Sequence, residues 1–275
     1  MRCRVGLRTA LPGVTLLVLG LGVGACADPP ESPAPPSPPP APAETPPPAP
    51  APPAARGAYE VTPLQFYGGI SGEITVIPIP RSGPVEVDRD REVCGQYRLT
   101  DESAMASASG GLANVVVRLV GVTKGKPWLQ RSTPELTLSQ CRFDPHVLLL
   151  DPGEGLKLRN LDGILYQVRS LSRKNPPLSV DQPGYQKEVA LGPGSFAEPE
   201  FIGVWCDAHA WMSAVIVVTD SPYYTVTNRT GTFKLSQIPP GPYTLEFWHE
   251  RYGSRTREVR VQANQVIDMT ERFVG

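Results

Sequence analysis

The sequence lacks several features that would point to common functional classes. It has only three histidines in 275 residues, and no window of helical length repeats its apolar side chains with a helical period. It also lacks a Ser/His/Asp motif order, a paired-carboxylate motif, a zinc signature and a phosphate-binding loop. Each of these would be needed for a familiar class of enzyme, so we expect a protein that is not an enzyme.

Neither sign of charge dominates the chain. Without Arg2, Arg4 and Arg8 of the N-terminal leader, 23 basic residues remain against 27 acidic ones, a formal charge of −4. Domains that bind nucleic acid usually carry a strongly basic surface, so we expect no nucleic-acid partner. The same balance gives no sign of a basic face for binding membranes.

The leader, residues 1–25, predicts export. Its arginines precede the apolar run LPGVTLLVLGLGVGA, which is too short and too rich in glycine for a membrane-spanning helix and is typical of a signal peptide. The run ends in VGAC, which resembles the lipobox of bacterial lipoproteins and implies cleavage before Cys26 and acylation of its thiol. We therefore expect a lipid-anchored protein of the bacterial cell envelope, facing the periplasm or the exterior. An ordinary signal peptide followed by a chance cysteine is the alternative.

A proline-rich linker follows, over residues 26–60. Residues 27–56 hold 15 prolines in 30 positions. Such a composition cannot form a hydrophobic core or a regular hydrogen-bond ladder, which predicts a disordered stalk with polyproline II character. Its expected role is to hold a folded head away from the membrane.

The cysteines support an oxidising compartment. Cys3 leaves with the leader and Cys26 carries the lipid, so three cysteines remain in the head. We favour Cys94–Cys141 as the disulfide, worth roughly 4 kcal/mol in the chain-entropy model. Cys206 is then the free thiol, and metal ligation is a good reason for an exported protein to keep one.

The head predicts an all-β fold with a domain boundary near residue 221. Short runs rich in β-branched residues alternate with turn sequences such as DPGEG, LDG and GPG, which is typical of a β-sandwich. We expect one domain over 61–221 and a second, small one over 222–275. The expected strands of the first lie at 70–79, 113–122, 146–150, 155–161, 164–171 and 213–218.

The motif VWCDAHAWM, directly before SAVIVV, places Cys206, His209 and Met212 three residues apart. A blue-copper site uses two imidazoles and one thiolate in a plane, with a weak axial thioether. One loop at a strand end could therefore supply three of the four ligands. Trp205 and Trp211 could provide the apolar shell around such a site.

The block from GLKLRN through LDGILYQV to CDAHAWM resembles the C-terminal half of a cupredoxin, the Greek-key sandwich of plastocyanin and amicyanin. The resemblance implies a copper site in which Cys206, His209 and Met212 are ligands. It also implies a histidine six residues after Asn160, the residue that ends the preceding strand. This sequence has Tyr166 at that position.

Tyr166 therefore stands at the position of the missing fourth ligand. A neutral phenol with a pKa of about 10 is a poor substitute for imidazole as a copper ligand. We expect Tyr166 to be a packing residue that closes the site. His146 is an alternative source of the imidazole, although it lies on a different strand. His249 is expected to be structural.

Residues 69–275 more widely resemble exported bacterial proteins that combine a cupredoxin-like part with a carboxypeptidase regulatory-like part, sometimes labelled methylamine-utilisation proteins. The shared motifs include LANVVVRL, CRFDPHV, CDAHAWM and TVTNRTGTFKLSQIPPGPYTLEFWHE. The resemblance implies that 222–275 forms a transthyretin-like sandwich, a kind of domain that is usually not catalytic. This segment is short for a sandwich, so strands from 69–122 could complete it, with the cupredoxin part inserted between them.

Two functions remain open. The first is a lipid-anchored cupredoxin that captures copper or transfers electrons, and exchanges them with a redox or copper-transfer protein. The second is a metal-free cupredoxin-like lipoprotein that serves as a structural module or binds protein or carbohydrate.

Overall fold

A computed structural model describes residues 59–129 and 132–275. The predicted signal peptide (1–25), the lipidated Cys26 and all but the last two residues of the predicted linker (26–60) lie outside the described residues. In the part that is described, no helix is both long enough and apolar enough to cross a membrane. The described residues form two β-sandwiches, so the predicted all-β class is confirmed.

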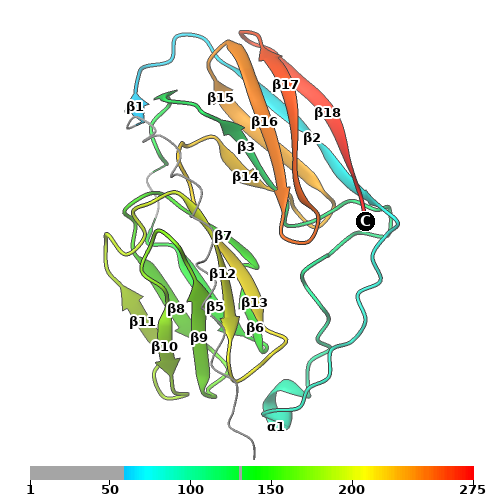
Figure 1. Ribbon diagram of the computed structural model, residues 1–275, viewed down its shortest axis with the longest axis vertical. Coiled ribbons are helices and arrows are strands. Elements are labelled where there is room, and N and C mark those ends of the chain that lie inside the picture. Colours follow the sequence, from blue (N-terminus) through cyan, green and yellow to red (C-terminus); the bar gives the residue numbers. More distant parts are fainter. Residues whose placement is uncertain (1–58, 130–131) are drawn as a thin grey trace, which may run out of the picture. The chain divides into compact units, whose positions relative to one another are not determined.

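The first sandwich packs a five-stranded sheet against a four-stranded sheet (Figure 1). The five strands have the order β10-β9-β12-β13-β7, and only β13 and β7 run parallel. The four have the order β11-β8-β5-β6, in which β5 and β8 run parallel. Their bounds are β5 (Glu135–Ser139), β6 (Arg142–Asp144), β7 (Val147–Leu150), β8 (Leu156–Asn160), β9 (Tyr166–Leu171), β10 (Ser179–Gln182), β11 (Glu188–Leu191), β12 (Glu200–Cys206) and β13 (Ser213–Val218).

The second sandwich pairs a four-stranded sheet, β14-β3-β16-β17, with a three-stranded sheet, β15-β2-β18. Its core includes Ile70, Leu119, Leu245 and Phe247. A small parallel pair, β1 with β4, lies beside it. The bounds are β1 (Glu60–Val61), β2 (Gly68–Ile77), β3 (Val116–Val120), β4 (Lys124–Gly125), β14 (Tyr224–Val226), β15 (Thr232–Ile238), β16 (Gly241–His249), β17 (Gly253–Val261) and β18 (Val266–Val274).

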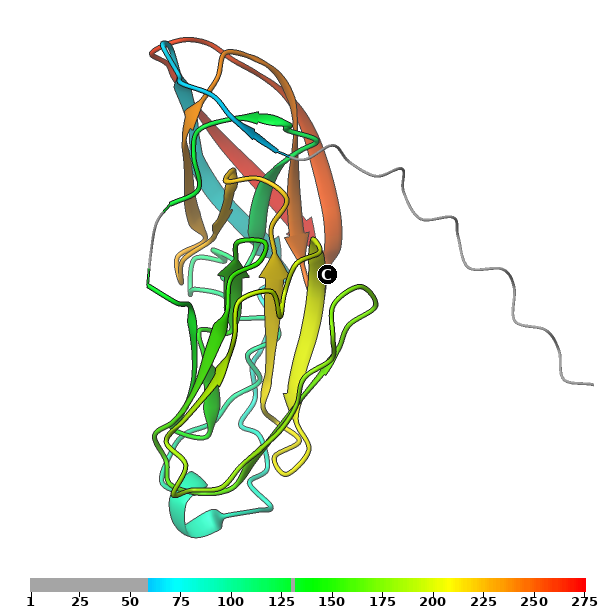
Figure 2. The same ribbon diagram turned by 90° about the vertical axis from the view of Figure 1, so that its left-hand side faces the viewer.

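Strands from both ends of the head build this second sandwich. Strand β2 lies between β15 and β18, and β3 lies between β14 and β16 (Figure 2). The first sandwich is thus inserted between β3 and β14. The segment 61–221 contributes strands to both sandwiches. This agrees with the alternative in which strands from 69–122 complete the short segment 222–275.

The apolar run SAVIVV, which follows the motif with Cys206, His209 and Met212, shows how sequence determines packing in this fold. Neighbouring side chains of a strand point to opposite faces of the sheet. On β13, Ile216 and Val218 point into the first core, while Val215 and Val217 join a separate cluster with Val116 of β3. The strand is buried on both faces, which explains why its sequence is continuously apolar rather than alternating.

A long connection between β2 and β3 carries the only helix of the described residues, α1 (Arg91–Cys94), to the first sandwich (Figure 1). A disulfide between Cys94 and Cys141, the pair favoured from the sequence, attaches α1 to the turn between β5 and β6. Both cysteines are fully buried in a cluster with Leu99 and Trp211. The disulfide thereby holds an otherwise irregular segment against the loop that contains Cys206.

His249 ends β16 in the core of the second sandwich. Its ring packs against Tyr252 at 4.9 Å between centroids, and its Nδ1 accepts a hydrogen bond from the backbone N–H of Arg251 at 3.1 Å. Burial, with a smaller contribution from the neighbouring His146, lowers the pKa of His249 to about 4, although Glu250 opposes the shift. His249 is therefore neutral and structural at pH 7.

This lowered pKa predicts acid sensitivity. The unfolded chain takes up a proton at His249 near pH 6.5, whereas the folded chain does so near pH 4, so the stability is complete above pH 6.5 and falls as the pH drops toward 4. Between pH 7 and pH 5 the loss is about 2 kcal/mol. Urea unfolding of wild type and His249→Gln at both pH values measures it. The variant should lack this part of the pH dependence, and equal slopes in the two proteins would contradict the assignment.

Candidate functional site

Cys206, His209 and Met212 occupy one tight loop between β12 and β13. The backbone N–H of His209 donates to the carbonyl of Cys206, and that of Met212 donates to the carbonyl of His209, at 3.3 and 3.0 Å. The Cys206 N–H in turn donates to the Met212 carbonyl at 3.3 Å, which closes the loop. The three side chains are 1%, 0% and 2% exposed, so the loop turns all of them inward.

The thiol of Cys206 faces the imidazole of His209. The Sγ and Nδ1 atoms are 3.5 Å apart, and the backbone N–H of Gln167 on β9 also points at Sγ, at 3.4 Å. Burial raises the pKa of the Cys206 thiol, against the opposing effect of the backbone N–H groups of Gln167, Ala208 and His209. Without a metal ion, the Cys206 thiol is therefore protonated and lies beside Nδ1 of His209.

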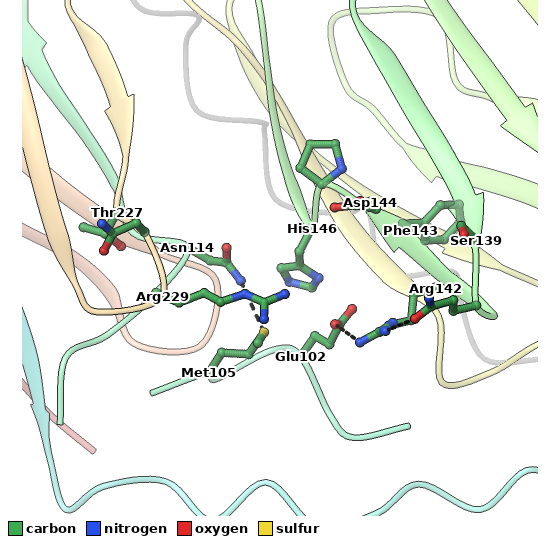
Figure 3. Close-up of a pocket in the computed structure, with 14 residues that line it drawn as sticks. Glu102, Met105, Asn114, Ser139, Arg142, Phe143, Asp144, His146, Thr227 and Arg229 are labelled. Atoms are coloured by element: carbon green, nitrogen blue, oxygen red, sulfur yellow. Dashed lines mark hydrogen bonds and ion pairs between the residues drawn. The ribbon is translucent and has the colours of Figure 1, made fainter. Parts of the chain in front are cut away.

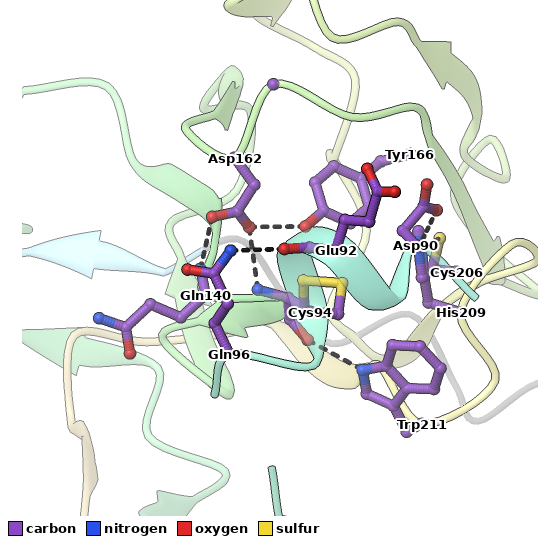
Figure 4. The surroundings of a disulfide bond; sticks show 12 residues. Asp90, Glu92, Cys94, Gln96, Gln140, Asp162, Tyr166, Cys206, His209 and Trp211 are labelled. Atoms are coloured by element: carbon purple, nitrogen blue, oxygen red, sulfur yellow. Dashed lines mark hydrogen bonds and ion pairs between the residues drawn. A yellow bond between two sulfur atoms is a disulfide. The ribbon is translucent and has the colours of Figure 1, made fainter. Parts of the chain in front are cut away.

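The remaining faces of His209 are also occupied (Figure 4). Its Nε2 lies 2.8 Å from the carboxylate of Asp90, which comes from the segment before α1. Its ring contacts Tyr166 and Trp211, with centroids 5.2 and 5.1 Å away. The imidazole therefore has its Nδ1 toward Cys206, its Nε2 toward Asp90 and aromatic rings as neighbours.

Tyr166, at the position of the missing histidine, is fully buried in the same core. Its hydroxyl donates to Asp162 at 2.6 Å, and that carboxylate also accepts from the backbone N–H groups of Gln140 and Cys141 at 2.8 and 2.9 Å. Burial and the adjacent Asp162 raise the pKa of Tyr166. The phenol stays protonated and donates its hydrogen bond to Asp162, so it is unsuitable as a metal ligand.

Met212 lies in the core cluster that also contains Cys206 and Tyr166. Its thioether is the one further soft donor on the loop. The structure thus brings Cys206 and His209 into direct contact, and places Met212 in the core cluster that includes Cys206.

His146 does not complete this site. Its Nε2 contacts the carboxylate of Glu250, on the turn after β16. Burial lowers the pKa of His146, but the hydrogen bond and charge of Glu250 outweigh that effect and the pKa is raised overall. Figure 3 shows its ring beside Glu102 and Arg229, at a polar cavity of about 430 Å³. This imidazole is part of a separate charged cluster.

The donor set can be tested for its fit to copper. In residues 59–129 and 132–275, no group of three or more His, Cys, Asp or Glu side chains is placed to hold a metal ion. The pair Cys206 and His209 nevertheless suits one soft ion. Their donor atoms are 3.5 Å apart, and bonds of about 2.3 Å to sulfur and about 2.0 Å to nitrogen can bridge that separation. Thiolate, imidazole and thioether together favour Cu(I).

Two residues of the site were not foreseen from the sequence. Asp162 lies in the LDG turn, where an aspartate is ordinary turn chemistry. Asp90 lies in a run of charged residues, DRDRE, whose composition indicates a solvent-exposed loop. Only the pairing of Cys141 with Cys94, two residues after the end of that run, could have indicated that this loop approaches the first sandwich.

A comparison with protein families supports one part of this description. Residues 210–272 match the carboxypeptidase regulatory-like domain. No curated protein matches the chain. The matched residues include strands β14 to β17 and most of β18, so the carboxypeptidase regulatory-like part of the predicted fold class is confirmed in the second sandwich.

Among solved structures, a reduced Cu(I) form of amicyanin P52G covers 33% of this chain and 86% of its own, at 14% identity and a TM-score of 0.28. Amicyanin from Paracoccus versutus covers 33% and 85%, at 11% identity and 0.25. The Cu-containing nitrite reductase NirK from Thermus scotoductus SA-01 covers 34%, at 16% identity and 0.29. The matched part spans only 24% of that reductase chain. At these low identities and TM-scores, the matches support no conclusion about the fold or the function of this chain.

Proposed function

We propose that this protein is a lipid-anchored, cupredoxin-like protein of the bacterial cell envelope that holds one copper ion as Cu(I). The ion binds between Cys206 and His209, and Met212 supplies a thioether. The observation that carries the proposal is the approach of Sγ to Nδ1 at 3.5 Å inside a fully buried loop. A structural thiol in a core needs no ring nitrogen directed at it, whereas a metal-binding thiol needs a second ligand at about this separation.

The surroundings of the pair favour a soft, monovalent ion. The N–H of Gln167 points at Sγ, and such a donor stabilises the thiolate that forms when metal replaces the thiol proton. Burial keeps water away from the ion. A blue Cu(II) site requires a second imidazole. In this chain Tyr166 occupies that position, and its hydroxyl donates a hydrogen bond to Asp162. The site is therefore built for copper capture and delivery to a copper-transfer partner rather than for fast electron transfer.

A Cu(I) titration of the head domain in competition with a chromophoric chelator tests the proposal. We expect one equivalent to bind, and Cys206→Ser to abolish binding because Cys206 is the free cysteine of the described residues. His146→Gln is the matched control, since His146 contacts Glu250 instead of the loop. It should bind like wild type. Failure of the wild-type protein to compete for Cu(I) at any chelator strength would refute the copper function.

The metal-free alternative also has a specific observation in its favour. Tyr166 packs on His209, and its hydroxyl is tied to Asp162, so the position of the missing ligand is filled by a well-packed side chain. In that case the Cys206 and His209 contact is a buried hydrogen bond in a structural or interaction module. The same titration decides between the two, because this alternative predicts no binding.

The anchor rests on the leader and on Cys26, for which VGAC is the supporting sequence. Full-length protein extracted from membranes should carry an acylated cysteine at its new N-terminus, detectable by the mass of that peptide. An unmodified N-terminus after Cys26 has been removed would contradict the anchor without affecting the copper site.

A further inference from the structure

Asp90 reaches His209 from a distant part of the chain. It lies on the connection between β2 and β3, outside both sandwiches, and 119 residues separate it from His209. Its Oδ2 is 2.8 Å from Nε2 of the buried imidazole, while 42% of the Asp90 side chain remains exposed (Figure 4). Asp90 thus contacts the edge of the His209 ring that faces away from Cys206, and we ask what this contact does for a candidate ligand.

The backbone around Asp90 holds the carboxylate in place. Asp90 adopts the left-handed conformation, with φ 45° and ψ 42°, which aspartate tolerates better than most residues. Its carbonyl accepts the N–H groups of Val93 and Cys94 at 2.9 and 2.8 Å, and Cys94 is bonded to Cys141. Trp211 of the ligand loop donates to the Cys141 carbonyl at 3.1 Å. The segment with Asp90 and the loop with His209 are therefore attached to the same disulfide.

The contact determines which ring nitrogen of His209 carries hydrogen. An ionised carboxylate only accepts hydrogen bonds, so Nε2 must be the protonated nitrogen of the neutral ring. The lone pair then lies on Nδ1, which faces Cys206 at 3.5 Å. In the opposite tautomer, two lone pairs would meet at Asp90 and no lone pair would face the thiol.

We propose that Asp90 is a positioning residue that prepares His209 as a metal ligand by holding it in the Nε2–H tautomer. The metal role rests on the function proposed above, whereas the tautomer is a property of the metal-free protein. A carboxylate behind a ligating histidine fixes the orientation of the ring and raises the basicity of the other nitrogen. Asp90 also covers the Nε2 edge of the ring, so a partner protein cannot contact His209 directly while the segment is in place.

Nitrogen-15 NMR of the metal-free protein, labelled at histidine, tests the tautomer. In wild type we expect the Nε2–H form of His209. Asp90→Gly removes the carboxylate at no conformational cost in the left-handed region, and should release the ring to a mixture of tautomers. Asp90→Asn keeps an acceptor oxygen and should restore the wild-type form. Asp88→Asn removes a charge two residues away and should change nothing. An Nδ1–H ring in wild type, or an unchanged ring in Asp90→Gly, would overturn the proposal.

Cu(I) affinity provides the second measurement. Loss of a carboxylate behind a ligating histidine typically costs 10–100-fold in metal affinity, so Asp90→Gly should bind Cu(I) about 10-fold more weakly, with Asp90→Asn closer to wild type and Asp88→Asn unchanged. Equal affinity in wild type and Asp90→Gly would overturn the link between tautomer and metal. If wild type binds no Cu(I) at all, the proposed function fails, while the NMR result still decides the role of Asp90.

Discussion

The variant Tyr166→His is expected to become intensely coloured when Cu(II) is added, while the wild-type protein stays colourless. Two imidazoles and one thiolate in a plane define a blue-copper site, and a thiolate bound to Cu(II) in this geometry absorbs strongly in the visible range. The wild-type site holds Cys206 and one imidazole. The Tyr166 ring lies 5.2 Å from the His209 ring and in the same core cluster as Cys206, so an imidazole at position 166 would face both.

The matched control is Tyr166→Phe. It retains an aromatic ring of similar size, removes the hydrogen bond to Asp162 and adds no ligand, so it should be about 1 kcal/mol less stable and remain colourless. Absorption spectra and copper content of the three proteins are the measurements. A colourless Tyr166→His protein with one bound copper would show that the new imidazole does not meet the thiolate, and that position 166 is not the fourth ligand position.

Features that depend on neighbouring residues could be predicted from the sequence. The loop with Cys206, His209 and Met212 could be predicted because the three-residue spacing and the apolar strand that follows are both local signals. The strands at 147–150, 156–160, 166–171 and 213–218 lie within or match predicted runs, because burial on one or both faces leaves a clear apolar pattern. No run was predicted for β5, β6, β10, β11 or β12. Of these, β10 and β11 are edge strands whose sequences SVDQ and EVAL are short and partly polar.

Features that depend on distant contacts could not be predicted in the same way. Asp90 acts on His209 across 119 residues, and nothing in DRDRE distinguishes a carboxylate that meets a buried ring from one that meets water. The role of Asp162 depends on the approach of Tyr166 and the β5–β6 turn to one carboxylate. The membership of β2 and β3 in the second sandwich follows from pairing with strands more than a hundred residues away, which no local period can indicate.

The inserted arrangement explains why a disulfide is needed beside the site. The connection between β2 and β3 leaves one sandwich, passes α1 and returns, with few regular hydrogen bonds along the way. Ordering such a segment costs conformational entropy that its own packing does not offset well. The Cys94–Cys141 bond and the small cluster around it hold the segment against the first sandwich.

Removal of this disulfide is expected to lower the free energy of unfolding by about 4 kcal/mol, because the cross-link constrains a long loop of the unfolded chain. The two cysteines are 47 residues apart in sequence and both are fully buried. The double variant Cys94→Ala/Cys141→Ala should show this loss in urea unfolding. Cys206→Ser is the control for the loss of a buried sulfur without a cross-link, and should cost much less.

The same variant should also loosen the candidate site before the fold is lost. Without the bond, α1 and Asp90 can leave His209, so amide hydrogens of Val93 and Cys94, which donate to the Asp90 carbonyl, should exchange much faster with solvent. Strands β12 and β13, which pair over most of their length in the core, should keep protection close to their global stability. A double variant with slow exchange at Val93 and position 94, and with His209 still in its Nε2–H form, would show that packing alone holds Asp90 over the site.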